Sequence, residues 1–216
     1  YRAIKNATIT SASSKASYIL MALSFWLILQ ALLGLSNVYN ANTAAFPPRI
    51  VLMGILPAIC AIAMLFLFTK GRRFMDGLPI IELTWINVMR VPVEISLYWL
   101  FLHKAVPEIM TFEGRNFDIL AGLTAPIIAN YSRSLKSSKT YVLLIWNIIS
   151  LGLLMNIVYI AFFSAPSPVQ KFAFEQPNIA ILYFPFNWLP TFIVPVVLFG
   201  HLASIRHLLR RKKDRM

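Results

Sequence analysis

The residues best suited to chemistry lie within one apolar stretch, 78–102, which carries Glu82, Arg90 and Glu94. An ionised side chain in the middle of a bilayer costs at least about 2.5–3.5 kcal/mol, so such residues usually face other helices and have partners. If the stretch is helical, Arg90 and Glu94 lie one turn apart on the same face. We therefore expect them to form an ion pair inside a helical bundle.

Two more polar residues belong to this stretch. Asn87 precedes Arg90 by three residues, so Asn87, Arg90 and Glu94 form one polar stripe. Glu82 lies about 12 Å from Arg90 along the helix axis, on another part of the surface. Pro92 lies within the stripe, lacks an amide hydrogen and frees a backbone carbonyl. Such a stripe is typical of a path for ions, protons or a small substrate, but the same charges can instead hold helices together.

Asn187 is a further candidate, because it lies in a stretch, 179–202, that is interrupted by Pro185, Pro190 and Pro195. Each proline leaves a backbone carbonyl without its helical donor. Broken helices often surround binding sites in transporters. Proline is also tolerated in membrane helices that have no such site, so both interpretations of Asn187 stay open.

Other amide side chains are predicted to serve helix packing. Asn147 and Asn156 are nine residues apart, which places them on opposite faces of a helix, so only one can face the polar stripe. Gln30 lies in the first apolar stretch. Amide side chains of this kind commonly form hydrogen bonds between membrane helices.

Metal binding finds little support in the sequence. His103 and His201 are predicted at opposite ends of their helices, about 30 Å apart, which is too far to share a metal ion. A site of His103, Glu113 and Asp118 is an alternative. The single cysteine of the chain cannot form an internal disulfide. We predict no metal and no cofactor.

Catalytic motifs are absent from the sequence, including G-x-S-x-G, H-E-x-x-H, G-x-G-x-x-G and the phosphate-binding loop. A pair of Glu82 and His201 is one catalytic arrangement that remains to be considered, because both residues are predicted near the same side of the membrane. We name no catalytic residue, and a function other than catalysis is favoured.

Apolar helices must position these residues. Of the 216 residues, 58% are hydrophobic and 13% are charged, and the mean hydropathy is +0.69. Soluble domains contain about 45–50% apolar residues. A helix that crosses the hydrocarbon needs about 20 residues, and we predict six such spans at 17–39, 50–68, 78–102, 117–132, 141–163 and 179–202.

The span 117–132 is the shortest and contains Asp118, Pro126 and Asn130, so a re-entrant loop is its alternative. Lys and Arg accumulate on the cytoplasmic side of membrane proteins. Six crossings place most of the 20 Lys and Arg residues on one side, together with both termini, whereas loss of this span would move the majority to the other side. The net charge of +12 is therefore a topology signal rather than a nucleic-acid footprint.

The sequence thus predicts an all-α bundle of six transmembrane helices that forms one membrane domain over residues 1–216. Both the N- and the C-terminus are expected in the cytoplasm, and the membrane is an inner or plasma membrane. The lipid bilayer is the expected partner. The basic C-terminal end, from Ile205 onward, has helical spacing of Ile205, Leu208 and Leu209, and either contacts anionic headgroups or only stops translocation.

Two functions fit these features. The first is a small transporter or channel-like protein. Its path would pass Glu82, Asn87, Arg90, Glu94 and Asn187. The second is a noncatalytic membrane subunit or scaffold, in which the same charges fix helix packing. An enzyme is the third and least supported function.

Overall fold

The computed structural model describes residues 16–133 and 137–213, and this part of the chain is helical, with no strand. The all-α prediction is confirmed for these residues. Residues 1–15, 134–136 and 214–216, and the side chains of residues 137–139 and 211–213, lie outside the description. In chain order the elements are α3 (Ala16–Leu35), η1 (Val51–Ile55), α4 (Leu56–Leu67), α5 (Thr69–Asp76), α6 (Ile80–Trp85), η2 (Ile86–Met89), α7 (Arg90–Leu102), η3 (Glu108–Met110), α8 (Ile119–Tyr131), α9 (Ser137–Ser164), η4 (Ala180–Leu182), η5 (Leu189–Ile193) and α10 (Val194–Lys213).

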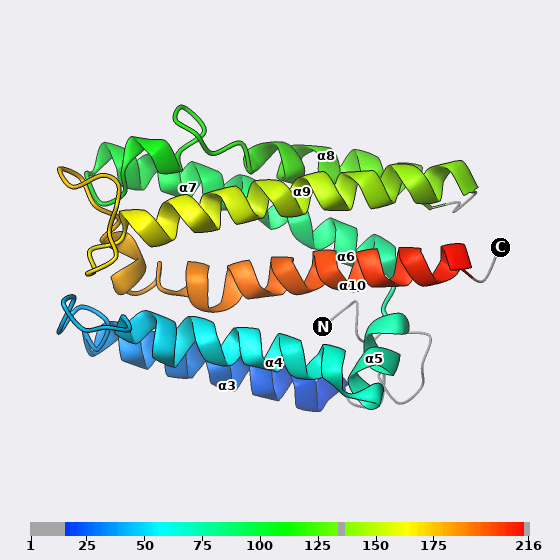
Figure 1. The fold of residues 1–216 in the computed structure, drawn as a ribbon, viewed down its shortest axis with the longest axis horizontal. Helices are drawn as coiled ribbons and strands as arrows, with labels where there is room; N and C mark the ends of the chain where they lie inside the picture. Colours follow the sequence, from blue (N-terminus) through cyan, green and yellow to red (C-terminus); the bar gives the residue numbers. More distant parts are fainter. Residues whose placement is uncertain (1–15, 134–136, 214–216) are drawn as a thin grey trace.

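The long helices lie lengthwise beside one another (Figure 1). Helices α3 and α4 form one side of the bundle, α7, α8 and α9 form the other, and α10 runs between them. Successive long segments run in opposite directions. The connecting segments 36–50, 103–118 and 165–188 therefore gather at one end, which we call the loop end, and α5 and the end of α10 lie at the other, the α5 end (Figure 1).

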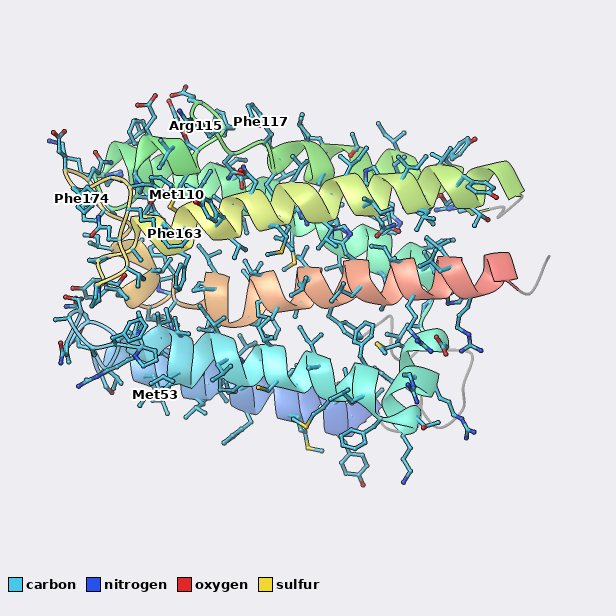
Figure 2. All side chains as sticks on the ribbon, in the orientation of Figure 1. Met53, Met110, Arg115, Phe117, Phe163 and Phe174 are labelled. Atoms are coloured by element: carbon cyan, nitrogen blue, oxygen red, sulfur yellow. The ribbon has the colours of Figure 1, made fainter. Side chains whose placement is uncertain are left out.

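Many large apolar side chains are exposed on this bundle, and side chains project from it along its length (Figure 2). A large number of exposed apolar side chains is typical of proteins that contact a membrane or a partner. The exposed side chains come from α3, α8 and α9 among other elements, and they include Phe25, Ile28, Leu32, Leu123, Ile127, Ile145, Ile148 and Ile149.

Helix length and composition support fewer spans than six. Three helices of the described residues are long and apolar enough to cross a membrane, namely Ala16–Leu35, Thr140–Ser164 and Leu189–Arg210. The pair Val51–Leu67 and Thr69–Asp76 passes the same test only together, with a bend of 90° between its halves. By length and composition alone, the described residues therefore contain three candidate spans, or four with the bent pair.

The remaining two predicted spans fall short for different reasons. The continuous helical segment 80–102 is long enough, but it carries Glu82, Arg90 and Glu94 and is not among the candidate spans. Helix α8 has 13 residues, which is about 20 Å of helix and less than the hydrocarbon thickness of about 30 Å.

The last predicted span, 179–202, begins too early. Residues 180–182 form only a 3₁₀ turn, and the continuous helix begins at Leu189. Pro185 precedes this helix, and Pro190 lies in its first turn, where no amide donor is needed. The helix continues through Lys213, so the basic end is part of α10 rather than a separate tail.

The segment 80–102 is helical as predicted, with a 3₁₀ turn at Ile86–Met89 directly before Arg90. Pro92 lacks the amide hydrogen that an α-helix would direct to Val88, which accounts for a locally altered hydrogen-bond pattern. The apolar side chains of α7, α9 and α10 pack together toward the loop end and form the largest buried core. Its members include Leu97, Leu154, Ile157 and Val197.

Candidate functional site

Arg90 lies at the centre of a buried polar cluster. Its Nη1 atom forms an ion pair with Asp118 Oδ1 at 2.9 Å and donates a hydrogen bond to the Ser150 carbonyl at 3.1 Å. Arg90 and Asp118 are no more than 4% exposed. Since Asp118 directly precedes α8 and Ser150 belongs to α9, the guanidinium joins α7 to both helices.

The expected ion pair between Arg90 and Glu94 is wrong, because Arg90 pairs with Asp118 instead. Helical side chains lean toward the N-terminus of their helix. Arg90 therefore extends away from Glu94, which follows it by one turn. This order of a cation before an anion is also the less favourable one in a helix.

Glu94 is held by an amide rather than by a cation. Asn116 Nδ2 lies 2.7 Å from both Glu94 Oε1 and Glu94 Oε2, and 2.9 Å from the Met110 carbonyl. The Asn116 side-chain oxygen accepts a hydrogen bond from the Asp118 amide at 3.0 Å. Asn116 thus positions both carboxylates of the cluster, and sequence spacing alone gave no signal for it.

His201 of α10 completes the cluster. Its Nε2 atom lies 2.9 Å from Arg90 Nη2, and its Nδ1 atom lies 2.9 Å from Asn147 Oδ1. Arginine only donates, so Nε2 accepts and Nδ1 carries the proton that is donated to Asn147. Asn147 Nδ2 in turn donates to the Leu143 carbonyl at 2.8 Å. In this arrangement the imidazole of His201 is neutral.

The suggested pair of Glu82 and His201 is wrong, because His201 bonds to Arg90 and Asn147. Glu82 is half-buried and lies two helical turns before Arg90. Asn87 is buried and donates to carbonyls of its own helix, those of Leu83 and Thr84.

Asn187 belongs to a second polar cluster, apart from Arg90. It is fully buried, and its Nδ2 atom donates to the Gln30 carbonyl at 2.6 Å. Gln30 Nε2 donates to the Met53 carbonyl at 3.0 Å, and its Oε1 atom accepts a hydrogen bond from Tyr39. This cluster joins α3, η1 and the chain before η5, which agrees with the packing role predicted for Gln30.

Asn147 and Asn156 do lie on opposite faces of α9, as predicted. Asn147 is 1% exposed and bonds to His201, whereas Asn156 is on the surface and donates to the Arg115 carbonyl at 2.8 Å. Only Asn147 therefore belongs to the cluster around Arg90.

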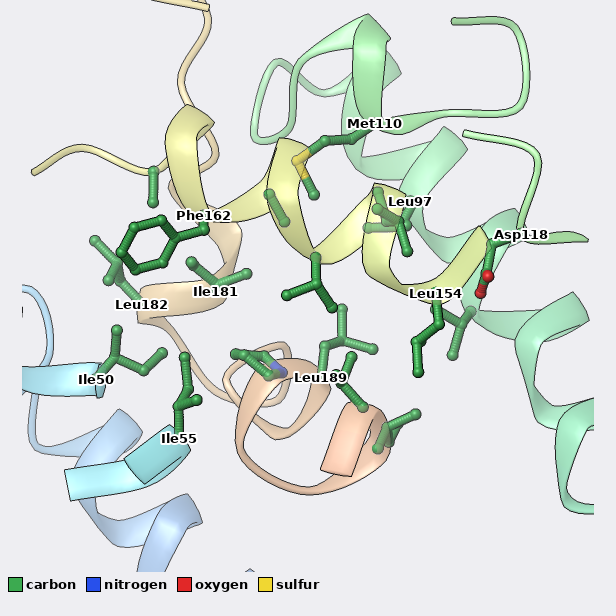
Figure 3. Close-up of a pocket in the computed structure, with 18 of the residues that line it drawn as sticks. Ile50, Ile55, Leu97, Met110, Asp118, Leu154, Phe162, Ile181, Leu182 and Leu189 are labelled. Carbon is green, nitrogen blue, oxygen red and sulfur yellow. The ribbon is translucent and has the colours of Figure 1, made fainter. Parts of the chain in front are cut away.

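A cavity of about 200 Å³ lies beside the Arg90 cluster and extends toward the loop end. Figure 3 shows Asp118 at one margin of this loop-end cavity and Ile50, Phe162 and Leu182 at the opposite margin. Its ionisable lining residues in the described chain are Arg90, Glu94 and Asp118. The rest of the wall is mainly aliphatic and includes Leu97, Leu154, Ile157, Val158, Leu189 and Val197.

A second cavity, of about 420 Å³, lies between α3, α4 and α10. Its lining is apolar apart from Thr191, and it includes Leu23, Trp26, Phe192 and Phe199. No ionisable side chain of the described residues lines it. The loop-end cavity is therefore the one that combines an apolar volume with charged groups.

The proposed metal site of His103, Glu113 and Asp118 is wrong. Asp118 pairs with Arg90, and His103 Nδ1 bonds to the Trp99 carbonyl at 2.8 Å. Among residues 16–133 and 137–213, no group of three or more His, Cys, Asp or Glu side chains is arranged to hold a metal ion.

The fold and the site define an all-helical protein with helices able to cross a membrane and a buried charge cluster at its centre. Residues 46–209 match a family described as a domain of unknown function, DUF8737, and the chain belongs to this family. No curated protein and no solved structure matches the chain. The matched region contains the Arg90 cluster and the whole wall of the loop-end cavity.

Proposed function

We propose that the protein is a small transporter of an inner or plasma membrane, and that it carries an amphipathic molecule by way of the loop-end cavity. In this proposal six segments cross the bilayer and both termini lie in the cytoplasm. Glu82, Asn87, Arg90 and Glu94 line the route. The charged and polar side chains that support the proposal belong to one helical segment, 80–102, and to the helices that cover it.

Six crossings are supported by the lengthwise arrangement of the segments, with successive connections at alternate ends of the bundle (Figure 1). The charges of segment 80–102 do not oppose insertion, because Arg90 and Glu94 are at most 2% exposed and are paired or hydrogen-bonded inside the bundle. Helix α8 is short, but its start at Asp118 is covered by α7 and α9 rather than by lipid.

Charge placement supports the same orientation. Lys70, Arg72 and Arg73 lie on α5, and Arg206 and Arg210 lie near the end of α10, all at the α5 end. Asp76 pairs with Arg206 and Arg210. We propose that the other basic side chains at this end contact anionic headgroups of the cytoplasmic leaflet. Those of residues 211–216 lie outside the described side chains.

The observation that supports the transport proposal is the lining of the loop-end cavity, which is apolar along its wall and charged at one end. Binding sites for small molecules are mostly apolar and contain a few polar groups that orient the ligand. The loop-end cavity has an aliphatic wall and ends on Arg90, Glu94 and Asp118. An amphipathic molecule would place its chain along Leu154 and Val158 and its polar group at these side chains.

A flip assay in liposomes tests the proposal. The probe is a single-chain amphiphile with an NBD fluorophore, and dithionite reports how fast the probe leaves the inner leaflet. Val158→Phe narrows the cavity from α9, whereas Val142→Phe makes the same change on an exposed part of the same helix. We expect flipping with the native chain and Val142→Phe, and loss with Val158→Phe. Equal rates for both variants, or a native rate no faster than protein-free liposomes, would overturn the proposal.

A noncatalytic scaffold is the second candidate, and it has its own supporting observation. Both terminal nitrogens of Arg90 are hydrogen-bonded, to partners on three different segments. Such a cluster can serve packing alone. If so, Arg90→Leu with Asp118→Leu should keep assembly intact, Asp118→Leu alone should disrupt it, and no flipping should be seen with any variant.

A further inference from the structure

The charges around the loop-end cavity do not cancel. Its ionisable lining residues in the described chain are one guanidinium, Arg90, and two carboxylates, Glu94 and Asp118. His201 accepts a hydrogen bond from Arg90 and is neutral, so it adds no positive charge. The walls of the cavity therefore hold one negative charge in excess when both carboxylates are ionised.

The excess charge resides on Glu94. Arg90 directs its terminal nitrogens at Asp118, the Ser150 carbonyl and His201, and Asp118 is the carboxylate of its ion pair. Glu94 receives its hydrogen bonds from the neutral Asn116 side chain, at 2.7 Å to each oxygen. A buried carboxylate without a cation is costly, and a positively charged ligand group or a proton reduces that cost.

The place of Glu94 along the helix suits a bound headgroup. Arg90, Glu94 and Leu97 follow one another at helical spacing on the wall that faces the cavity. Leu97 and Met110 continue that wall toward the loop end, where Phe162 and Leu182 lie across the cavity (Figure 3). A headgroup at Glu94 thus has aliphatic surface on its loop-end side for one alkyl chain.

We infer that the loop-end cavity binds a single-chain amphiphile with a protonated amine headgroup, and that the Glu94 carboxylate is the counter-ion of that amine. This inference rests on the proposed function and names the substrate class of the same cavity. The ammonium group takes the excess negative charge, and the aliphatic wall takes the chain. A carboxylate headgroup would meet the same charge with the wrong sign and be rejected.

Three ligands with the same chain and different headgroup charge test this inference. Decylamine, decanol and decanoate are titrated calorimetrically into the full chain in phosphatidylcholine nanodiscs, and protein-free nanodiscs are subtracted. For the native chain we expect decylamine to bind at least about tenfold more tightly than decanol, as is reasonable for a close buried charge pair, and decanoate to bind most weakly.

Glu94→Gln removes the charge and keeps the size of the side chain. With this variant we expect decylamine to lose its advantage and to bind with an affinity similar to that of decanol. Glu113→Gln is the matched control, because Glu113 is an exposed carboxylate at the loop end outside the cavity wall. It should keep the full preference for decylamine.

The outcomes separate the inference from the proposed function. If decanol binds and Val158→Phe abolishes that binding, but decylamine has no advantage, the cavity stands and the amine inference is overturned. An unchanged preference in Glu94→Gln also overturns it. If none of the three ligands binds, the proposed function fails as well. The native headgroup series decides the question even if Glu94→Gln does not fold.

Discussion

At the scale of single residues, Arg90 is held by groups from three other segments of the chain. Asp118 supplies the negative charge, the Ser150 carbonyl accepts a second hydrogen bond, and neutral His201 accepts a third. Each group keeps the guanidinium away from the apolar outer surface. The stability of the bundle should therefore depend on Asp118 more than on Glu94.

Asp118→Asn and Glu94→Gln test this difference, since each exchanges a buried carboxylate for an amide. Asp118→Asn leaves the guanidinium without its anion, and we expect a loss of about 3–5 kcal/mol in the free energy of unfolding. Glu94→Gln should change it by less than about 1 kcal/mol, because Asn116 can still donate to the new amide oxygen. Unfolding in mixed detergent micelles gives both values. A larger loss for Glu94→Gln than for Asp118→Asn would mean that Glu94, rather than Asp118, is the main partner of Arg90.

The two asparagines of α9 offer a second comparison. Asn147→Ala removes the acceptor of the His201 Nδ1 proton in a buried place, and we expect a loss of about 1–3 kcal/mol. Asn156→Ala, on the exposed face, should stay within about 0.5 kcal/mol. Thermal unfolding of both variants under the same conditions measures the difference. Similar midpoints for the two would mean that the His201 hydrogen bond contributes little.

Sequence reasoning could identify Arg90 and Glu94 as buried polar residues, because charges in an apolar helix have few other places to go. It could not find the true partners. Asp118 is 28 residues from Arg90, and His201 is 111 residues away, so their contacts depend on how helices pack. The role of Asn116 could not be predicted, because it lies in a polar connecting segment where an asparagine is common whether or not it is buried.

At the scale of elements, the two π-helical turns η1 and η5 pack against each other. Gly54 of η1 lies so close to Thr191 of η5 that a Cβ atom at residue 54 would be 2.3 Å from Thr191 Cγ2. Real Cβ atoms do not tolerate that distance, so the Thr191 side chain or the turns themselves would have to shift. The close approach of these turns helps to shape the loop-end cavity, whose wall includes Ile55 and Leu189.

Gly54→Ala should therefore destabilise the protein and weaken decanol binding, whereas Gly152→Ala should do neither. A Cβ atom at Gly152 meets no atom within 4 Å, and alanine favours a helix over glycine by up to about 1 kcal/mol. Unfolding midpoints and calorimetric titration measure both effects. If Gly54→Ala behaves like Gly152→Ala, the turns do not pack as tightly as described.

Hydropathy located the helices well but not the start of the last one. Residues 179–188 are apolar, and hydropathy cannot distinguish them from a helix. In the folded protein Ile181 and Leu182 pack with Tyr39 and Ile50 in a small core at the loop end. An apolar segment can thus be a buried connection. Because the helix runs from Leu189 to Lys213, His201 lies about midway along it and is fully buried in the bundle.

At the scale of the whole molecule, an apolar exterior surrounds a polar centre. Composition was sufficient to predict this arrangement. A chain that is 58% hydrophobic has more apolar side chains than its interior can bury, so the rest must lie on the outer surface. The number of complete crossings could not be predicted from composition. Segment 80–102 buries its charges inside the bundle, and α8 is only 13 residues long. Whether these two segments cross is a property of the assembled bundle.

Cysteine labelling tests the six crossings. In a Cys60→Ala background, we expect Glu113→Cys and Lys171→Cys to react with an impermeant maleimide on intact cells, and Lys70→Cys to react only after permeabilisation. The first two residues lie in loop-end connections and the third lies on α5. Reaction of Glu113→Cys and Lys171→Cys from opposite sides would mean that 117–132 does not cross.

Photo-crosslinking tests the central claim most directly, because it reports where an amphiphile rests. A decyl amphiphile with a diazirine on its chain is bound to the full chain in nanodiscs, irradiated, and the modified residues are mapped by mass spectrometry. The account predicts labels on Leu97, Leu154 and Val158 that excess decylamine removes. Labels spread over outward-facing residues such as Phe25 and Ile145, with none in the cavity wall, would contradict it.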